Sequence, residues 1–135
     1  MRHSPDRSLG IVALNRPQAD LIQLELDRLI HDNEDAARYQ ARWSNGLEPL
    51  FVKNLENVQG DERDTIFIST VFGDDESGNF YQRFGPINSV VGHRRLNVLF
   101  TRAKHQLVLF SSLPTEKIKP SETTHWGVRA LKEYL

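Results

Sequence analysis

The sequence predicts an α/β fold with a mainly parallel sheet, and two observations carry that prediction. Residues 9–14 (LGIVAL) form a continuous apolar run, which is typical of a strand covered on both faces. A helical pattern follows directly, and a second apolar, β-branched run occupies residues 65–72 (TIFISTVF). A buried strand followed by a helix is the unit from which parallel sheets are built. We therefore expect a three-layer domain.

The first helix is predicted to begin after Asn15 and to end near His31. Asn15 is a favourable N-cap residue, Pro17 suits the first turn, and Gln18 stands three residues after the cap, as in a capping box. The buried side of this helix is predicted to consist of Ala19, Ile22, Leu26, Leu29 and Ile30. These residues recur at the spacing of one helical face.

The middle of the chain is predicted to hold a second helix and two strands. A short surface helix is expected within 33–46, with the inward side chains Ala36, Tyr39 and Trp43. A strand over 47–54, a polar loop over 56–64 and the strand 65–72 follow. A turn at 73–79 and a connecting stretch then lead to the most basic part of the chain.

The basic segment, residues 92–112, is predicted to be a helix followed by a strand. Its basic residues are Arg94, Arg95, Arg102 and Lys104, and it contains no acidic residue. Its apolar residues Leu96, Leu99, Phe100 and Ala103 recur at helical spacing. Arg95 and Arg102 are seven residues apart, so one helix would place them on nearly the same side, about 10 Å apart. The run at 107–110 predicts a central buried strand, which places the guanidinium groups at one edge of the sheet.

The composition bounds the class of protein. A chain of 135 residues suffices for one domain with its own core. It contains no cysteine, which excludes disulfides and thiolate metal sites. No apolar run approaches the ~20 residues of a membrane span, so we expect a cytoplasmic protein without a membrane partner. The net charge is −1, so any nucleic-acid affinity must come from a local patch, and residues 94–104 form the only dense one.

Several kinds of site are excluded by spacing. The acidic turn at 73–79 lacks the ligand order and the closing glutamate of an EF-hand. The histidines form no pair at zinc-ligand spacing, so no metal site is expected. The chain has no G-x-S-x-G motif and no cysteine nucleophile. Acyl transfer is therefore excluded.

The loop 56–64 (ENVQGDERD) is a candidate binding loop, because loops at strand ends are where α/β folds bind ligands. Gly60 would let the backbone approach a ligand closely. Glu62 could accept a hydrogen bond from a ribose hydroxyl or pair with an arginine. The alternative is a solvated loop in which Glu62 pairs with Arg63 or a helix end. Arg63 itself is expected to be a solvated loop residue.

Three stretches, in this order, resemble motifs IV, V and VI of the second RecA-like motor domain of superfamily 1 DNA/RNA helicases. They are LGIVALNRPQADLI (9–22), NVQGDERDTIFIS (57–69) and GHRRLNVLFTRAK (92–104). Within superfamily 1, these motifs are similar to those of the branch that contains the nonsense-mediated-decay helicase. The stretch FVKNLENVQGDERD (51–64) also resembles large, mostly bacterial helicase-like proteins in which a restriction-endonuclease-like domain follows. Motif IV departs from the pattern, because Ala13, Leu14 and Asn15 replace a Thr-Pro-aromatic start.

The resemblance implies roles for particular residues. Arg102 matches the motif VI arginine that reaches the γ-phosphate of ATP. Glu62 matches the motif V carboxylate near the ribose and phosphates, and Gln59 with Gly60 matches the turn that links nucleotide and nucleic acid. Arg95 matches the arginine pair that opens motif VI and supports this site.

The resemblance also implies cofactors and partners. The chain has no GxxxxGK[ST] loop and no acidic strand end beside such a loop, so ATP and Mg²⁺ are expected to be bound mainly by another, N-terminal RecA-like domain of the same longer chain. Single-stranded DNA or RNA is the expected polymer, and an endonuclease-like domain is a possible downstream partner. The expected division is a lead-in at 1–8, the RecA-like domain at 9–113, and a linker with the start of a C-terminal helix at 114–135.

The function predicted from the sequence is the C-terminal motor half of an ATP-dependent helicase or translocase, inactive alone, in a P-loop NTPase fold that lacks the P-loop itself. One alternative is a nucleic-acid- or protein-binding module that keeps the fold but drives no motor. Another alternative is a small-molecule-binding domain of flavodoxin-like fold. The arginines of the basic segment, which have no acidic neighbours in the sequence, argue against it. A P-loop and an acidic Mg²⁺ site upstream would favour the motor.

Overall fold

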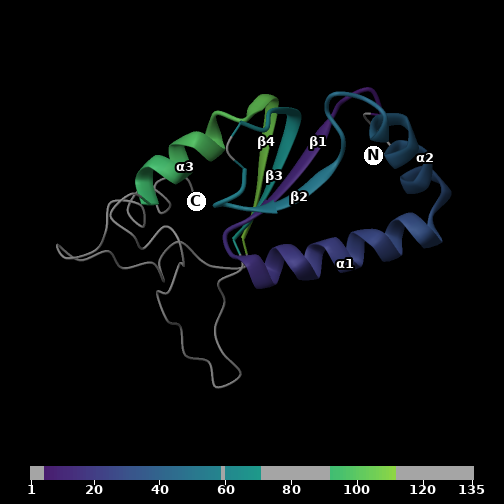
Figure 1. Cartoon of the computed structure of the whole chain (residues 1–135), viewed down its shortest axis with the longest axis horizontal. Helices are drawn as coiled ribbons and strands as arrows, with labels where there is room; N and C mark the ends of the chain where they lie inside the picture. Colours follow the sequence, from purple (N-terminus) through teal and green to yellow (C-terminus); the bar gives the residue numbers. More distant parts are fainter. Residues whose placement is uncertain (1–4, 59, 71–91, 112–135) are drawn as a thin grey trace, which may run out of the picture.

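A computed structural model of the protein describes residues 5–58, 60–70 and 92–111 (Figure 1). The elements are β1 (Leu9–Ala13), α1 (Arg16–Asp32), α2 (Glu34–Ser44), β2 (Phe51–Asn54), β3 (Arg63–Thr70), α3 (Gly92–Phe100) and β4 (Ala103–Ser111). The strands form a parallel sheet in the order β2-β1-β3-β4. The α/β fold with a parallel sheet is therefore confirmed. The predictions for 71–91 and 112–135 lie outside the described residues.

Helix α1 begins as the sequence predicts. The Asn15 side chain accepts a hydrogen bond from the Gln18 backbone N–H at 2.9 Å, and a proline stands in the first turn. Ala19 and Leu26 are buried against the sheet, but Leu29 is 47% exposed. The prediction that Leu29 is buried is wrong. Leu29 stands three residues after Leu26, so its side chain points ~60° away from that of Leu26 around the helix axis and lies at the margin of the buried face.

Helix α2 also follows the prediction and holds the segment that precedes β1. Asn33 caps it by accepting from the Ala36 N–H at 3.1 Å, and Ala36 and Tyr39 are buried. The Tyr39 hydroxyl donates to the Arg7 carbonyl at 2.7 Å, and burial raises the pKa of Tyr39 to about 12. The indole of Trp43 donates to the carbonyl of Pro5 at 3.2 Å. Residues 5–8 are thus part of the packed structure.

Strands β2 and β3 start at different residues from those predicted. The prediction that a strand begins at Leu47 is wrong, because this residue is 100% exposed and pairing starts at Phe51. Strand β3 begins at Arg63, inside the stretch predicted to be a loop. Arg63 pairs with Ala103, and its N–H donates to the Arg102 carbonyl at 3.0 Å. Backbone pairing with β4 therefore extends β3 into polar sequence.

The basic segment does not form one long helix. Helix α3 ends at Phe100, the N–H of Arg102 donates to the Leu99 carbonyl at 3.1 Å, and β4 begins at Ala103. The prediction that Arg95 and Arg102 share one helical face is wrong, because pairing with β3 converts residues from 103 onward to extended backbone. Strand β4 is the outermost strand of the described sheet, and Phe110 is 52% exposed. Within the described residues, the prediction of a central buried strand is therefore also wrong.

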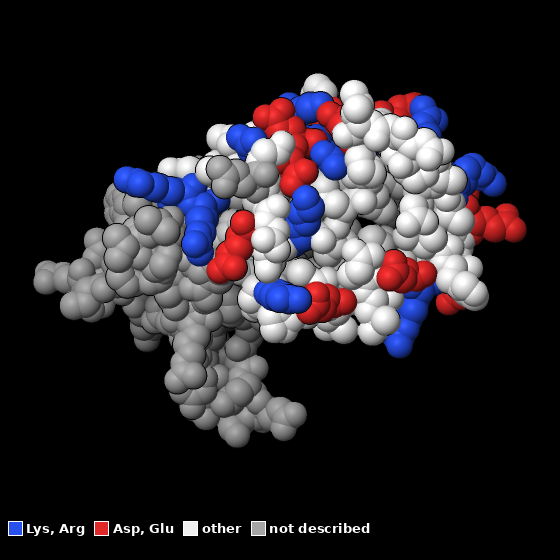
Figure 2. Space-filling view, in the orientation of Figure 1, with Lys and Arg blue, Asp and Glu red and all other residues white. Residues whose placement is uncertain are grey.

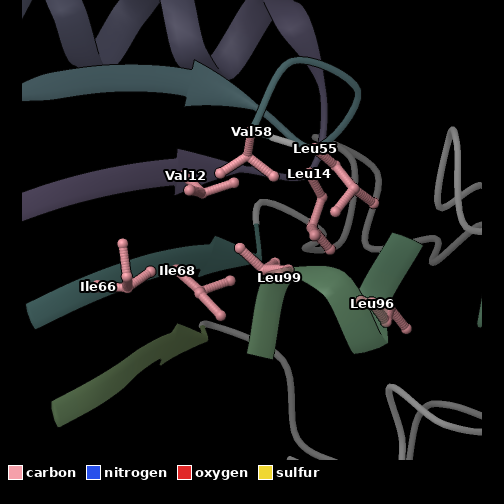
Figure 3. Close-up of a cluster of buried hydrophobic side chains, with 8 residues drawn as sticks. All are labelled: Val12, Leu14, Leu55, Val58, Ile66, Ile68, Leu96 and Leu99. Carbon is pink, nitrogen blue, oxygen red and sulfur yellow. The ribbon is translucent and has the colours of Figure 1, made fainter. Parts of the chain in front are cut away.

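The main hydrophobic core lies between the sheet and α3 (Figure 3). Its members are Val12, Leu14, Leu55, Val58, Ile66, Ile68, Leu96 and Leu99. Leu55 and Val58 belong to residues 55–62, the crossing segment, which connects β2 to β3. Because both side chains pack against α3 and the sheet, the core holds the crossing segment beside the basic segment. Figure 1 shows α1 on the other side of the sheet. No helix in the described ranges is long and apolar enough to cross a membrane.

Candidate functional site

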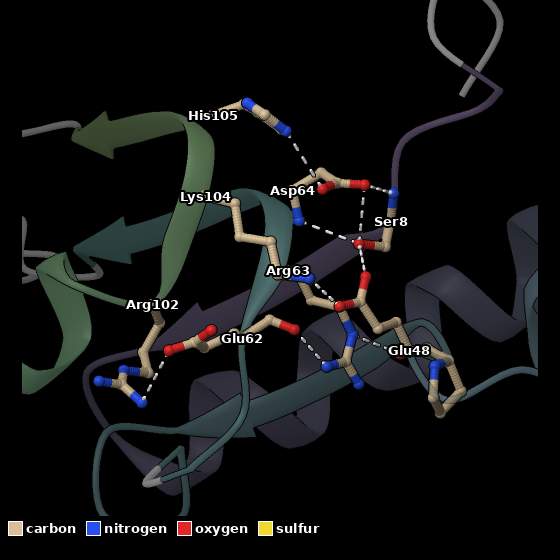
Figure 4. Close-up of polar contacts among 9 residues, drawn as sticks. Ser8, Glu48, Glu62, Arg63, Asp64, Arg102, Lys104 and His105 are labelled. Carbon is tan, nitrogen blue, oxygen red and sulfur yellow. Dashed lines mark hydrogen bonds and ion pairs between the residues drawn. The ribbon is translucent and has the colours of Figure 1, made fainter.

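Glu62 and Arg102 meet at the amino ends of two neighbouring strands (Figure 4). Glu62 directly precedes β3, and Arg102 directly precedes β4. Because the strands are parallel and Arg63 pairs with Ala103, the two preceding side chains are neighbours. Arg102 Nη1 lies 3.6 Å from Glu62 Oε1. The fold therefore brings together two of the predicted site residues from motifs V and VI.

The guanidinium of Arg102 is held mainly by its own turn. Its Nε donates to the Val98 carbonyl at 3.1 Å, and its Nη2 donates to the Thr101 hydroxyl at 3.2 Å. The Arg102 side chain is 21% exposed, whereas that of Glu62 is 52% exposed. A separation of 3.6 Å is an ion pair that is longer than a hydrogen bond. Glu62 can therefore be exchanged for another anion without disturbing the contacts that orient Arg102.

A second ion pair joins the crossing segment to α3. Arg95 Nη1 lies 3.6 Å from Glu56 Oε1, and the Glu56 side chain is 54% exposed. Arg95 does not contact Glu62 in any described interaction, so Arg95 and Arg102 belong to two separate ion pairs. Glu56 was missed by sequence reasoning. The available signal was charge complementarity, since each glutamate of the loop faces an arginine of the basic segment.

Gly60 has a positive φ of 85°, while an added Cβ would meet nothing within 4 Å. Glycine is therefore required here by the left-handed backbone conformation and not by crowding from other described atoms. Asp61, the next residue, pairs with Lys53 at 2.6 Å, which fixes the turn against β2. The predicted site residue Gln59 lies outside the described residues.

The prediction that Arg63 is a solvated loop residue is wrong. It is only 6% exposed, because β3 starts at this residue and the side chain turns inward. Its Nε donates to the Pro49 carbonyl at 2.9 Å, and its Nη1 donates to the Glu62 carbonyl at 2.6 Å. The guanidinium carbon lies 4.7 Å from the centre of the Phe51 ring. Arg63 thus fixes the backbone of Glu62 from the protein interior and leaves its carboxylate to Arg102.

Next to the Arg102–Glu62 pair lies a closed polar cluster made of Ser8, Glu48, Asp64 and Lys104, which we call the Ser8 network (Figure 4). Ser8 is fully buried, and its Oγ lies 2.6 Å from Glu48 Oε2 and 3.2 Å from Asp64 Oδ2. The backbone N–H of Ser8 donates to Asp64 Oδ2 at 3.0 Å, and the Asp64 N–H donates to Ser8 Oγ at 2.9 Å. Lys104 Nζ donates to Glu48 Oε1.

The Ser8 network shifts the titration of its members. The hydrogen bond from Lys104, followed by that from Ser8, holds the pKa of Glu48 below its ordinary value. The hydrogen bond from the Ser8 backbone holds the pKa of Asp64 below its ordinary value. The bond to Glu48 raises the pKa of Lys104. The network therefore favours the charged form of each group and joins the segment before β1 to β3 and β4.

The dense basic patch predicted at 94–104 is largely neutralised by the fold. Arg95, Arg102 and Lys104 pair with Glu56, Glu62 and Glu48, respectively, while Arg94 is exposed. Figure 2 shows acidic and basic side chains side by side across this face. Across the part of the chain that the structure describes, no group of three metal-ligating side chains gathers. The arrangement is suited to binding an anion at one or two guanidinium groups.

Comparison with known proteins places the chain in a family. Residues 1–113 match the family model described as an AAA domain. The chain is 41% identical over 129 residues to a Mycoplasma genitalium protein named uncharacterized ATP-dependent helicase MG140, and 39% identical over 133 residues to its Mycoplasma pneumoniae homolog; each alignment covers 96% of this chain and 11% of the relative. A Danio rerio protein, provisionally named helicase mov-10-B.2, is 31% identical over 103 residues, which cover 76% of this chain and 9% of that protein. The chain spans about a tenth of the length of these relatives.

Proposed function

The chain belongs to the AAA domain family, and from that premise we propose that it is the C-terminal motor half of an ATP-dependent DNA or RNA helicase or translocase. The resemblance to a superfamily 1 helicase motor domain is confirmed by the family match and by helicase relatives. The place of this domain as the second of two, the task of each residue and the activity of the whole protein are our proposal. Within it, the other RecA-like domain lies in the same longer chain.

The observation that carries the proposal is the Arg102–Glu62 pair. Arg102 is oriented by the Val98 carbonyl, and its remaining edge faces an exposed carboxylate at 3.6 Å. A planar guanidinium binds phosphate oxygens as it binds carboxylate oxygens. We therefore assign Arg102 as the arginine finger, which stabilises negative charge on the γ-phosphate of ATP held mainly by the N-terminal motor domain.

The residues present fit one end of a triphosphate. The Arg102 side chain is 21% exposed and the side chain of its counter-ion Glu62 is 52% exposed, so a phosphate can replace the carboxylate as the partner of the guanidinium. We assign Mg²⁺, like most of the triphosphate, to the partner domain, where the resemblance to helicases implies that the P-loop and the acidic metal site lie. Bound ATP supplies the phosphoryl group whose transfer to water drives the motor. The contribution of this chain is to orient Arg102 against that group.

The neighbouring residues take supporting roles in this proposal. Glu62, once released from Arg102, accepts from a ribose hydroxyl of the nucleotide. Gly60, together with Gln59, is assigned to the connection between the nucleotide and single-stranded DNA or RNA. Arg95, paired with Glu56 at 3.6 Å, holds α3 against the crossing segment. Closing and opening of the two motor domains then moves them along the strand, and an endonuclease-like domain is the proposed downstream neighbour.

Steady-state phosphate release tests the half-site assignment. The 135-residue chain is expected to show no ATP hydrolysis, because the residues that would hold triphosphate and Mg²⁺ lie in the other domain. The full-length protein is expected to hydrolyse ATP and to be stimulated by single-stranded DNA or RNA. Turnover by the chain alone that survives repeated purification would contradict the assignment.

Fluorescence anisotropy separates the motor half from a non-motor binding module. The 135-residue chain should bind single strands weakly, without sequence preference and with an affinity that falls steeply with salt, because its contacts are to phosphates. Tight binding that is insensitive to salt would favour the binding module. A full-length protein without nucleic-acid-stimulated ATP hydrolysis would favour it as well.

A further inference from the structure

The hydroxyl of Thr101 connects the end of α3 to the side chain of Arg102. Its Oγ1 donates to the Val98 carbonyl at 2.9 Å and accepts from Arg102 Nη2 at 3.2 Å. A threonine hydroxyl has one hydrogen and two lone pairs. Because a carbonyl oxygen only accepts, the one hydrogen goes to Val98 and the lone pairs face the guanidinium. The geometry thus makes Thr101 an acceptor for Arg102.

The Val98 carbonyl is open to side chains because the chain changes from helix to strand just after it. The N–H of Thr101 donates to the Asn97 carbonyl at 3.2 Å. The N–H of Arg102 donates to the Leu99 carbonyl at 3.1 Å. These two bonds leave the carbonyl of Val98, which lies between the two acceptors in the chain, to other donors. The last carbonyls of a helix need partners from outside its own ladder, and here the Thr101 hydroxyl and Arg102 Nε supply them.

These contacts occupy one particular side of the Arg102 guanidinium. In the planar fork of an arginine, Nε–H and one N–H of Nη2 point in the same direction. That side is turned to the Val98 carbonyl and the Thr101 hydroxyl. Nη1 belongs to the other side of the fork and lies 3.6 Å from Glu62 Oε1 (Figure 4). An anion that replaces Glu62 therefore meets the Nη1 side.

The backbone of Arg102 is fixed by contacts that do not involve Thr101 Oγ1. The Arg102 carbonyl accepts from the Arg63 N–H at 3.0 Å, and the next residue, Ala103, pairs with Arg63 in the sheet. Thr101 is exposed, so water can solvate Nη2 when the hydroxyl is removed, and no buried group loses its last partner. Removal of the hydroxyl therefore releases the guanidinium while the backbone and the fold stay in place.

We propose that Thr101 is a positioning residue for the arginine finger: its hydroxyl holds the Nε–Nη2 side of Arg102, so that the Nη1 side is presented to the anion. This inference rests on the proposed function, in which the anion is the γ-phosphate of ATP. Thr101 acts through Arg102 and not on the phosphate itself. Because a small misplacement of a catalytic group lowers the rate steeply, the hydroxyl matters to turnover more than to nucleotide binding.

Two substitutions of Thr101 in the full-length protein test the proposal. Valine keeps the branched shape of threonine and removes the hydroxyl, whereas serine keeps the hydroxyl. We expect Thr101→Val to lower the kcat of nucleic-acid-stimulated ATP hydrolysis about 10- to 100-fold, with a change in KM for ATP of less than about threefold. Thr101→Ser should retain most of the wild-type kcat. A wild-type kcat in Thr101→Val, or equal losses in the two variants, would overturn the proposal.

Ser44→Ala is the matched control. The Ser44 hydroxyl donates to the carbonyl three residues before it, that of Ala41, at 3.0 Å, as the Thr101 hydroxyl does to Val98, but among the described interactions it does not contact an arginine. Ser44→Ala should therefore leave kcat unchanged. The urea midpoints of the 135-residue chain should stay close to wild type in all three variants. A clearly lowered midpoint in Thr101→Val would show a structural role and overturn the proposal.

Nuclear magnetic resonance of the 135-residue chain separates this inference from the proposed function. The Nε–H of Arg102, which donates to the Val98 carbonyl at 3.1 Å, should give a signal that exchanges slowly with water and that Arg102→Ala removes. Thr101→Val should accelerate this exchange several-fold, and Thr101→Ser should not.

The outcomes distinguish the two proposals. Exchange that is unaffected by Thr101→Val would overturn the positioning role, whatever the activity of the full-length protein. If Arg102→Ala left ATP hydrolysis near wild type, the proposed function would fail, and the exchange of the Arg102 Nε–H would then decide alone whether Thr101 holds the guanidinium. If Arg102→Ala abolished hydrolysis and Thr101→Val did not lower it, the positioning role alone would fail.

Discussion

The charged residues around the sheet form two groups that are built differently. The Ser8 network surrounds a fully buried hydroxyl with contacts of 2.6 to 3.2 Å. The two open pairs, Arg102–Glu62 and Arg95–Glu56, are each 3.6 Å long, with carboxylates 52% and 54% exposed. The network uses its charges to join segments of the chain, whereas the open pairs leave theirs available to a ligand.

The difference comes from the neutral groups around the charges. In the Ser8 network, a hydroxyl and two backbone N–H groups take part alongside the ions. In the open pairs, the glutamates contact only the arginines in the described interactions, and Arg102 is oriented by Val98 and Thr101. Exposed ion pairs contribute little to stability, whereas hydrogen bonds to buried charged groups contribute more. Three substitutions test this division, and a fourth tests the buried guanidinium of Arg63.

The largest effect is expected for Arg102→Ala in the full-length protein. An arginine finger acts on charge that develops in the transition state, so nucleic-acid-stimulated ATP hydrolysis should fall about 10³- to 10⁵-fold. Nucleotide affinity should change far less, and the melting temperature should stay close to wild type. Arg102→Lys should not restore activity, because an ammonium lacks the planar fork.

Arg38→Ala is the matched control for Arg102→Ala, since Arg38 is an exposed arginine on α2 that pairs with Asp35 at 3.5 Å. It should retain nearly full activity. Similar small losses in both variants would show that Arg102 is not the finger. Arg63, which the sequence alone suggested as a solvated control, is unsuitable because it is buried.

Arg63→Ala should cause the next largest effect, on stability. The substitution leaves two carbonyl acceptors, of Pro49 and Glu62, without their partner and removes the packing on Phe51. We expect the free energy of unfolding to fall by about 3 kcal/mol, as measured by urea unfolding of the chain. Arg28→Ala, at an exposed pair on α1, should change it by less than ~0.5 kcal/mol.

Ser8→Ala should lower the free energy of unfolding by about 1 to 2 kcal/mol, because it removes the hydroxyl that the carboxylates share. The pKa values of Glu48 and Asp64 are lower in the folded protein. Their stabilisation is therefore complete above their unfolded pKa, near 4, and is lost as the pH falls through the lower folded values.

Urea midpoints measured from neutral to acidic pH test this role of the Ser8 network. The wild-type midpoint should fall on acidification, and the fall should be shallower in Ser8→Ala. Parallel pH profiles in the two proteins would show that Ser8 does not maintain the lowered pKa values of Glu48 and Asp64.

The smallest effect is expected for Glu56→Gln. Its pair with Arg95 is long and exposed, so the free energy of unfolding should change by less than ~0.5 kcal/mol. A double-mutant cycle with Arg95→Gln measures the coupling between the two residues. A coupling above ~1 kcal/mol would exceed what exposed pairs provide. The Arg95–Glu56 pair would then stabilise the fold, as the Ser8 network does, and would not count as an open pair.

Much of the fold could be predicted from local sequence. The apolar run of β1, the Asn15 cap of α1 and the inward Tyr39 of α2 all stand as expected. These features depend on neighbours within one or two turns of chain, which the sequence displays directly. Of the candidate site, Glu62 and Arg102 were identified through their motifs, and the fold brings them together.

The errors arose where contacts between distant residues outweighed local pattern. Ala103 fits the helical stripe of the basic segment, yet pairing with Arg63 makes it the first residue of β4. The same pairing draws Arg63 out of a polar loop and buries its guanidinium. Helical periodicity in the sequence gives no sign of this strand pairing, because the two paired residues are forty positions apart in the chain.

The sequence by itself determined the parallel α/β class, the order of the motifs and the residue types at the site. Only the tertiary structure decided which charges are free to act. Residues 94–104 contain basic charge alone, but the fold sets Glu48, Glu56 and Glu62 against three of their side chains. Charge is a property of each residue, whereas its availability depends on distance and burial, which arise when separate segments pack together.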